Sequence, residues 1–201
     1  MLAYSLRWEH RLGTEGASIE ITLADGRVIR SDSTYGVLNR LQTIPSAHLR
    51  ASPTDRDYAV QELFAFFVSW LNVFPGAVLN PPTPQGLSGQ WRHASEWVVL
   101  AARAGLPSLP YRQTSHDKID TSRLIGRLVP RDTPVQTVIV VGGHVVGSNV
   151  SPEIAEGCKR LAGIVNTPLL GVEFTSGLAG HWTFAGATPL PDLTLGGQAL
   201  L

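Results

Sequence analysis

The chain has 201 residues, of which 43% are hydrophobic and 16% are charged, and its formal net charge is zero. This length suffices for one large domain or two smaller lobes with a hydrophobic core. A net charge of zero provides no long-range field for nucleic acid or an anionic membrane, and we expect neither as a partner. Cys158 is the only cysteine, which excludes an internal disulfide and favours a reducing compartment.

The sequence indicates neither a signal peptide nor a membrane-spanning helix. Residues 1–11 lack a basic stretch followed by an apolar block, so we expect no signal peptide and a cytoplasmic location. The longest apolar run, residues 63–71, is far shorter than the about 20 residues of a membrane-spanning helix. We therefore expect this run to lie in a core helix.

The first predicted elements are a hairpin and a helix. Residues 17–23 alternate apolar and polar side chains, Asp25-Gly26 favours a tight turn, and residues 28–30 resume the strand. Residues 35–41 are a short segment of uncertain type. A helix is predicted to begin at Ser52-Pro53, where Ser52 is a suitable N-cap. One face of this helix is apolar and comprises Val60, Leu63, Phe64, Phe67 and Leu71.

A buried strand at residues 77–79 and a second helix come next. The helix is predicted to begin at Ser88 and to end at Gly105, where glycine permits a left-handed residue and Pro107 prevents continuation. Its inward face is predicted to contain Leu87, Trp91, Ala94, Val98 and Ala101, with Trp97 outside it. A further strand is predicted at residues 110–114. Strands separated by helices favour a parallel α/β sheet in this half.

The rest of the chain begins with a polar, irregular linker at residues 115–134. The pattern then predicts a hairpin from residues 137–141 and 144–146, joined by a Gly-Gly turn. A third helix begins after Ser151, and its inward face comprises Ile154, Cys158, Leu161 and Val165. A last hairpin has residues 169–174 as its first strand, and its second begins at His181.

Four of these pieces, in this order, resemble the RimK-like group of ATP-grasp ligases. They are the block from Asn80-Pro-Pro to Arg92-His93 with the run from Ala101 to Thr114, the strand pair of residues 138–147, the helix at Pro152, and the last hairpin. The resemblance spans residues 37–192. It implies an α/β fold in which a pre-ATP-grasp lobe, residues 1–114, is followed by the linker and by a reduced α+β C-terminal lobe, residues 135–201.

The departures from the family suggest that the ATP site is degenerate. In the family, a Glu-x-Asn on the last strand holds the magnesium of ATP, and the matching positions here are Gly186 and Thr188. The segments that bind nucleotide in the family are replaced by the short linker 115–134. Only Lys118 and Lys159 are lysines, although triphosphate binding generally uses cations and a metal held by carboxylates.

We therefore expect a non-catalytic ATP-grasp-like protein with no cofactor and no metal, a pseudoenzyme that binds a partner, a peptide or a small carboxylate. Its candidate ligand-binding residues, at the junction of the lobes, are Arg40, Arg92, His93 and Glu173. Lobe surfaces left uncovered by the missing segments favour a homodimer.

The alternative is a short ATP-dependent carboxylate–amine ligase that uses ATP and magnesium and borrows residues from a second chain. In that case arginines would replace the missing lysines and metal ligands, namely Arg92, Arg123, Arg127 and Arg131. A purely structural subunit is a third class. A histidine metal site at His144 and His181 is not favoured, because no third ligand has suitable spacing.

Overall fold

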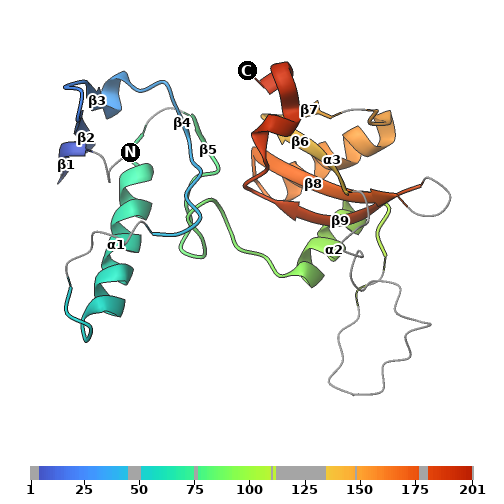
Figure 1. The fold of residues 1–201 in the computed structure, drawn as a ribbon, viewed down its shortest axis with the longest axis horizontal. Helices are drawn as coiled ribbons and strands as arrows, with labels where there is room; N and C mark the ends of the chain where they lie inside the picture. Colours follow the sequence, from blue (N-terminus) through green and yellow to red (C-terminus); the bar gives the residue numbers. More distant parts are fainter. Residues whose placement is uncertain are drawn as a thin grey trace. The chain divides into compact units, whose positions relative to one another are not determined.

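The computed structural model describes residues 5–44, 51–74, 77–109, 111, 135–147, 149–176 and 181–200. The chain divides into two compact units, Met1–Trp91 and Arg92–Leu201, which we call the N-terminal and C-terminal units (Figure 1). The fold is mixed α/β with small sheets, as predicted. Within the described ranges, no helix has both the length and the hydropathy needed to cross a bilayer.

The N-terminal unit begins with an antiparallel sheet in the order β1-β2-β3. Its strands are β1 (Ser5–Gly13), β2 (Gly16–Leu23) and β3 (Val28–Arg30). The predicted hairpin is confirmed, and Gly26 has the positive φ of 82° that its turn requires. Strand β1 was missed, although Leu6, Trp8 and Leu12 alternate there with charged residues, as in a strand with one apolar face.

A parallel strand pair and one helix complete this unit. β4 (Gly36–Leu38) pairs in parallel with β5 (Ala77–Leu79), and α1 (Arg56–Leu71) lies between them in sequence. The helix begins later than predicted, since Ser52 stabilises a separate turn. Its hydroxyl accepts a hydrogen bond from the backbone N–H of Asp55 at 3.2 Å and donates to Asp55 Oδ2 at 2.7 Å. Asp55 thus becomes the residue that precedes the helix.

The core of the N-terminal unit is formed by α1 and β2. Phe67 and Trp70 of α1 are buried together with Ile19 and Ile21 of β2. Trp70 packs edge-on against Phe67 and against Phe74, with ring centroids 6.1 and 5.6 Å apart. This edge-to-face geometry is preferred by aromatic rings because their edges are positive and their faces negative.

The C-terminal unit contains a four-stranded antiparallel sheet in the order β7-β6-β8-β9. Its strands are β6 (Val135–Val141), β7 (His144–Val146), β8 (Leu169–Ser176) and β9 (Trp182–Thr188). Both predicted hairpins are confirmed. Gly142 and Gly143 join β6 to β7 with φ of 54° and 86°, the double positive φ typical of a type I′ hairpin turn.

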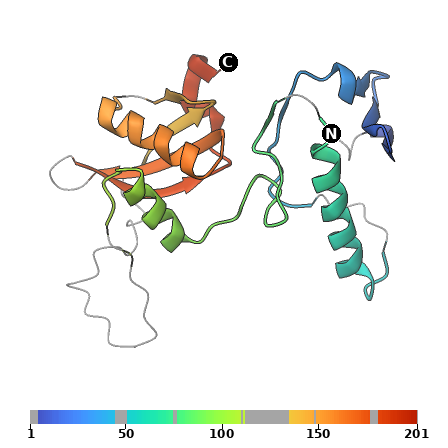
Figure 2. The same ribbon diagram turned by 180° about the vertical axis from the view of Figure 1, so that it is seen from behind.

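Two helices, α2 (Ala94–Arg103) and α3 (Pro152–Ile164), pack on one face of this sheet (Figures 1 and 2). The third predicted helix is confirmed as α3, with Ser151 as its N-cap and Cys158 and Leu161 fully buried. The segment that follows α2 approaches α3 closely, because a Cβ on Gly157 would lie only 2.5 Å from Leu106 Cδ2. A short 3-10 helix, η4 (Leu193–Leu200), contacts β6 and β7.

The start of α2 and its inward face differ from the prediction. The helix begins at Ala94 rather than Ser88, since Gly89 has a φ of 106° and His93 is extended at the N-cap. The buried face of the helix comprises Trp97, Leu100 and Ala101. Trp91, predicted inward, is 70% exposed, whereas Trp97, predicted outside the apolar face, is 9% exposed and belongs to the core.

The predicted domain boundaries stay a prediction, because residues 112–134, and with them the linker, lie outside the described residues. The predicted strand at residues 110–114 also falls almost entirely outside them. The helix α2, which we placed in the first lobe, contacts β9 and α3 of the C-terminal unit. By its packing, α2 belongs to that unit, whose first residue is Arg92.

Candidate functional site

The two positions that match the metal ligands of the family lie on β9, beside the candidate residue Glu173. Glu173 of β8 is paired with Gly186 of β9, and Gly171 is paired with Thr188. A Cβ on Gly186 would lie 3.5 Å from Glu173 Oε2. Residue 186 is therefore next to the only carboxylate in the sequences of these two strands.

The chain that follows β9 folds back over this part of β8. Pro191 is fully buried, and its Cβ lies 2.8 Å from the place where a Cβ on Gly171 would be. Thr188 Oγ1 accepts a hydrogen bond from the backbone N–H of Leu190 at 3.1 Å. Only glycine at position 171 permits this close approach, which covers the sheet beside Thr188.

This arrangement provides little negative charge for a metal ion. Magnesium in nucleotide sites is typically held by about one or two carboxylates together with the phosphates. Glu173 supplies one carboxylate, which is the lower end of this range, while Gly186 and Thr188 add no charge. Throughout the part of the chain that the structure describes, no three His, Cys, Asp or Glu side chains converge as a metal cluster, His144 and His181 included.

Arg92, at the start of the C-terminal unit, has structural partners on α2. Its guanidinium pairs with the carboxylate of Glu96, one helical turn further on. The same guanidinium lies 5.8 Å from the centre of the Trp97 ring, within the range of a cation–π interaction. The Arg92 side chain is only 13% exposed. It stabilises the beginning of α2, and its predicted role in ligand binding stays a prediction.

His93 is the N-cap of α2. Its Nδ1 accepts a hydrogen bond from the backbone N–H of Ser95 at 3.2 Å, which satisfies one of the N–H groups left unpaired at a helix start. The imidazole also packs edge-on against Tyr111, with ring centroids 5.9 Å apart. Arg92 and His93 are thus brought together at one helix end, as their adjacency requires.

Arg40 belongs to the N-terminal unit, whereas the other three candidates belong to the C-terminal unit, and the Arg40 side chain is exposed. Its neighbour Asn39 is the residue that sequence reasoning missed. Asn39 is 2% exposed, and its amide donates to the carbonyl oxygens of Asn80 at 2.8 Å and Leu87 at 2.6 Å. Burial and the preceding strand identify this hydrogen-bonded corner, and neither could be read from the sequence.

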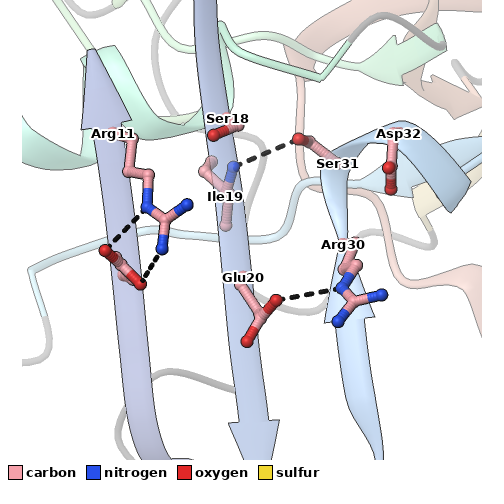
Figure 3. A pocket seen from close by; sticks show the side chains of 8 residues that line it. Arg11, Ser18, Ile19, Glu20, Arg30, Ser31 and Asp32 are labelled. Atoms are coloured by element: carbon pink, nitrogen blue, oxygen red, sulfur yellow. Dashed lines mark hydrogen bonds and ion pairs between the residues drawn. The ribbon is translucent and has the colours of Figure 1, made fainter.

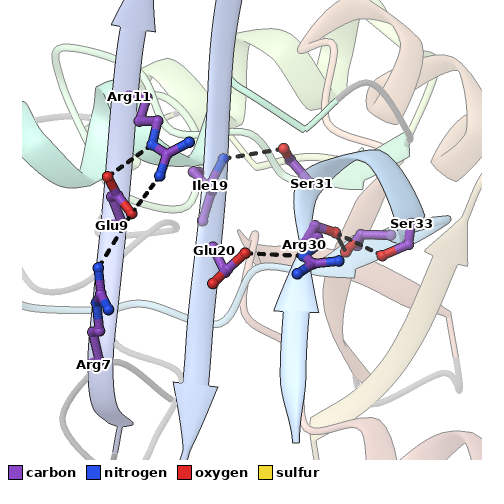
Figure 4. A network of polar contacts seen from close by, with 9 residues as sticks. Arg7, Glu9, Arg11, Ile19, Glu20, Arg30, Ser31 and Ser33 are labelled. Carbon is purple, nitrogen blue, oxygen red and sulfur yellow. Dashed lines mark hydrogen bonds and ion pairs between the residues drawn. The ribbon is translucent and has the colours of Figure 1, made fainter.

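A polar groove of about 270 Å³ lies on the sheet β1-β2-β3 (Figure 3). Arg11 donates two hydrogen bonds to Glu9, at 2.7 and 2.9 Å, and Arg30 donates to Glu20 at 2.9 Å. Figure 4 shows that Arg7 extends this row of charges along β1. The hydrogen bond from Arg11 holds the pKa of Glu9 below its ordinary value and raises the pKa of Arg11.

Both arginines of this groove are paired with carboxylates, and its lining also contains the carboxylate of Asp32. Each arginine drawn in Figure 4 faces a carboxylate of the same sheet, and all of these side chains are at least partly exposed to water. Exposed ion pairs of this kind contribute little to stability or to anion binding, because water and salt screen them. We assign this groove a solvated surface role and no ligand.

Comparisons with known proteins give no relative by sequence. No family model matches the chain. No curated protein matches it either.

Solved structures with a similar fold are known. MdnC, a macrocyclase from Microcystis aeruginosa bound with its precursor peptide, is 11% identical, with a TM-score of 0.64 over 92% of this chain and 79% of its own. A RiPP-associated ATP-grasp ligase from Chryseobacterium gregarium, in complex with ADP and a leader and core peptide, is 7% identical, with a TM-score of 0.64 over 94% and 78%. The ATP-grasp ligase PsnB, with a minimal precursor, Mg and ADP, is 16% identical, with a TM-score of 0.57 over 92% and 77%.

These likenesses show that the chain has an ATP-grasp-like fold, which confirms the coarser part of the predicted resemblance. They also overturn one expectation. We expected no cofactor, and this is wrong: structures of PsnB hold ADP with Mg or AMPPNP, which points to the alternative of ATP and magnesium. The short linker and the missing Glu-x-Asn misled the prediction, because neither shows what the remaining fold binds.

Proposed function

We propose that this chain is a peptide-binding protein of the ATP-grasp fold, a degenerate relative of the RimK-like ligases that does not turn over ATP on its own. The observation that supports this proposal most directly is the pairing of Glu173 with Gly186, where one carboxylate faces a glycine. Peptide binding is suggested by the neighbours MdnC and the Chryseobacterium ligase, whose structures contain precursor or leader peptides.

The low negative charge at Glu173, Gly186 and Thr188 argues against ATP turnover by this chain alone. Phosphoryl transfer depends on metal ions and cations that neutralise the charge developing on the transferred group. Near the paired strands, the described residues contribute one carboxylate and no lysine. The side chains of Arg92 and His93 are engaged in the start of α2. Arg40, Arg92, His93 and Glu173 stay as proposed ligand-binding residues for a peptide or carboxylate.

The second candidate is an ATP-dependent carboxylate–amine ligase that uses ATP and magnesium. It is favoured by the nucleotides and magnesium in the PsnB structures. Three of the arginines that it would need, Arg123, Arg127 and Arg131, lie outside the described residues. In this case a second copy of the chain would complete the site, so we propose a homodimer, which sedimentation at micromolar concentration would show.

Peptide binding is tested by selecting short random peptides on the immobilised protein, with heat-unfolded protein as the control. Selected peptides are then synthesised and titrated calorimetrically, with and without ATP and magnesium. We expect saturable peptide binding and no ADP release above the rate without protein. If no peptide binds the folded protein, the proposal fails; peptide-dependent ADP release would replace it with the ligase.

The substitution Gly186→Glu tests the reason for the missing turnover. A carboxylate at position 186 would lie beside Glu173 and create a pair that can hold magnesium. We expect this variant to be less stable without metal, because like charges face each other across the strands, and to regain stability with magnesium. Gly186→Gln is the matched uncharged control. Equal behaviour of both variants in a magnesium titration would show that no metal binds here.

A further inference from the structure

A second groove, of about 520 Å³, lies within the C-terminal unit. Three parts of the chain form it: the segment after α2, the loop and first turn of α3, and the start of β9. Its lining residues are Pro107, Asn149, Ser151, Ile154, His181 and Trp182. This volume falls in the range of about 300–1,000 Å³ that is typical of ligand pockets. None of the predicted site residues belongs to it.

The inner surface of this groove is apolar and well supported. Trp182 is half-buried and packs against Phe174, with ring centroids 5.4 Å apart. Ile154 is packed against the same core cluster, and Pro107 adds a rigid apolar edge. A surface of this kind, made of an indole, an isoleucine and a proline, suits a large apolar side chain.

The charge of the groove argues against a nucleotide. None of its lining residues is Lys, Arg, Asp or Glu, so it offers no cation for a polyphosphate. The nearby N-terminus of α3 is satisfied from within. Ser151 Oγ accepts from the N–H of Ile154 at 3.4 Å, and the pKa of Glu153 is lowered by its own backbone N–H and by Ser151. No external anion is needed there.

The strand beside the groove already accepts an extended chain along its outer edge. β9 is the last strand of the sheet, and the backbone N–H of Phe184 donates to Pro107 O at 2.7 Å. Ser108 and Phe184 form a parallel bridge. An extended segment next to Trp182 could therefore pair with the edge of β9 in the same parallel direction as Ser108.

We propose that this groove receives one large apolar side chain, best an aromatic one, of an extended peptide whose backbone is held by the polar rim. Asn149, Ser151 and His181 form this rim and offer donors and acceptors to peptide groups. The inference rests on the proposed peptide-binding function and adds to it a subsite and a specificity. The groove prefers an aromatic side chain of the peptide because such a side chain has a large contact area with Trp182 and Ile154.

The test uses the full chain and a blocked glycine–serine peptide with one central phenylalanine. The indole N–H signals of the labelled protein are followed by NMR, and the Trp182 signal is assigned from Trp182→Phe. We expect the peptide to shift this signal saturably and to leave the exposed Trp91 unmoved. Replacing phenylalanine by alanine should weaken binding about tenfold or more, the equivalent of about 1.4 kcal/mol.

Two variants of α3 separate the groove from other binding surfaces. Ile154→Trp fills the groove and should abolish the shift, whereas Ile164→Trp makes the same change at an exposed position of the same helix and should preserve it. An unmoved Trp182 signal, equal shifts with the alanine peptide, or binding that persists in Ile154→Trp would overturn the inference.

Different results would refute the proposed function and this inference. If the peptides selected on the immobilised protein bind Ile154→Trp as tightly as the unaltered chain, the groove is not the subsite, although peptide binding stands. If no selected peptide binds the unaltered chain, peptide binding itself is refuted. A shift caused equally by ADP would show that the groove accepts nucleotides, which contradicts its uncharged lining.

Discussion

The two units of this protein differ in how their cores are built. In the N-terminal unit, one helix places aromatic rings against a small sheet, and the rings meet edge to face. In the C-terminal unit, the central strands β6 and β8 are covered on both faces, so that Ile139 and Val140 are both almost completely buried. Strands buried on both faces typically contain continuous aliphatic runs, as β6 does at residues 138–141.

The units also differ in how completely their buried polar groups are paired. Among the described residues, two buried nitrogens lack a hydrogen-bond partner, Trp70 Nε1 and His10 Nε2, and both belong to the N-terminal unit. An unpaired buried polar group costs about 1–3 kcal/mol. In the C-terminal unit, His93 and Ser151 cap both helices. We therefore expect the N-terminal unit to unfold first.

The largest expected effect comes from deleting a core leucine in each unit. Leu161→Ala removes a fully buried side chain from the C-terminal core, and Leu71→Ala does so in the N-terminal core, each at a cost of about 2–5 kcal/mol. If the units unfold separately, each variant should lower one of two transitions in urea. Tryptophan fluorescence follows both transitions, since each unit contains tryptophans, and the substitution that lowers a transition assigns it to a unit.

The opposite outcome is that the two units unfold together. A single transition that both substitutions lower equally would mean that the units unfold together, and the contrast between their cores would then have no thermodynamic consequence. Leu195→Ala, at a 59% exposed position, provides the control that should change neither transition.

A smaller effect concerns Cys158 in the C-terminal core. Burial raises the pKa of its thiol from 9.0 to about 12. As pH rises, the unfolded chain loses this proton first, so the stability linked to the thiol is complete below pH 9 and falls between pH 9.0 and about 12. Cys158→Ala should flatten this part of the pH dependence, measured by urea unfolding. An unchanged slope would contradict the burial of the thiol.

The elements that the sequence predicted well are those whose signals are local. The turns at Gly26 and Gly142-Gly143 and the start of the helix after Ser151 each depend on a few adjacent residues, and all three are found where predicted. The start of α2 was wrong because Gly89 and His93 determine it through backbone conformation, which an apolar pattern does not contain. Trp91 precedes the helix and is exposed, whereas Trp97 belongs to the buried face of the helix, which the apolar pattern placed differently.

The candidate site was less predictable because it depends on strand register and on distant contacts. That Glu173 faces Gly186 depends on an irregularity in the β8–β9 pairing, between residues 173 and 174. The groove at Trp182 combines residues from positions 107 to 182, and no local pattern brings them together. The expectation of no cofactor failed for a related reason, since missing motifs do not reveal what a preserved fold binds.

A contact between helices offers a sharper test of the C-terminal unit. Arg160 of α3 donates from Nε to the carbonyl oxygen of Ala104 at 2.9 Å, at the C-terminal end of α2. This charged donor satisfies one unpaired carbonyl and opposes the negative end of the helix dipole. Arg160→Ala should lower the stability of the unit by about 1–2 kcal/mol in urea unfolding. Lys159→Ala, its neighbour in an exposed pair with Glu156, should have far less effect.

The smallest expected effect lies in the charged row of the N-terminal sheet. Arg30 pairs with Glu20, and Glu20 faces Glu9 across the strands, so Arg30→Met leaves two like charges opposed. Both members of the Arg30–Glu20 pair are exposed to water, so the loss should stay below about 1 kcal/mol and disappear in high salt. Arg27→Met, which breaks a turn pair with Asp25 and opposes no carboxylates, is the matched control. A larger loss that persists in salt would mean that this row stabilises the unit by more than surface charge, and the N-terminal unit would then depend on its polar face as well as on its aromatic core.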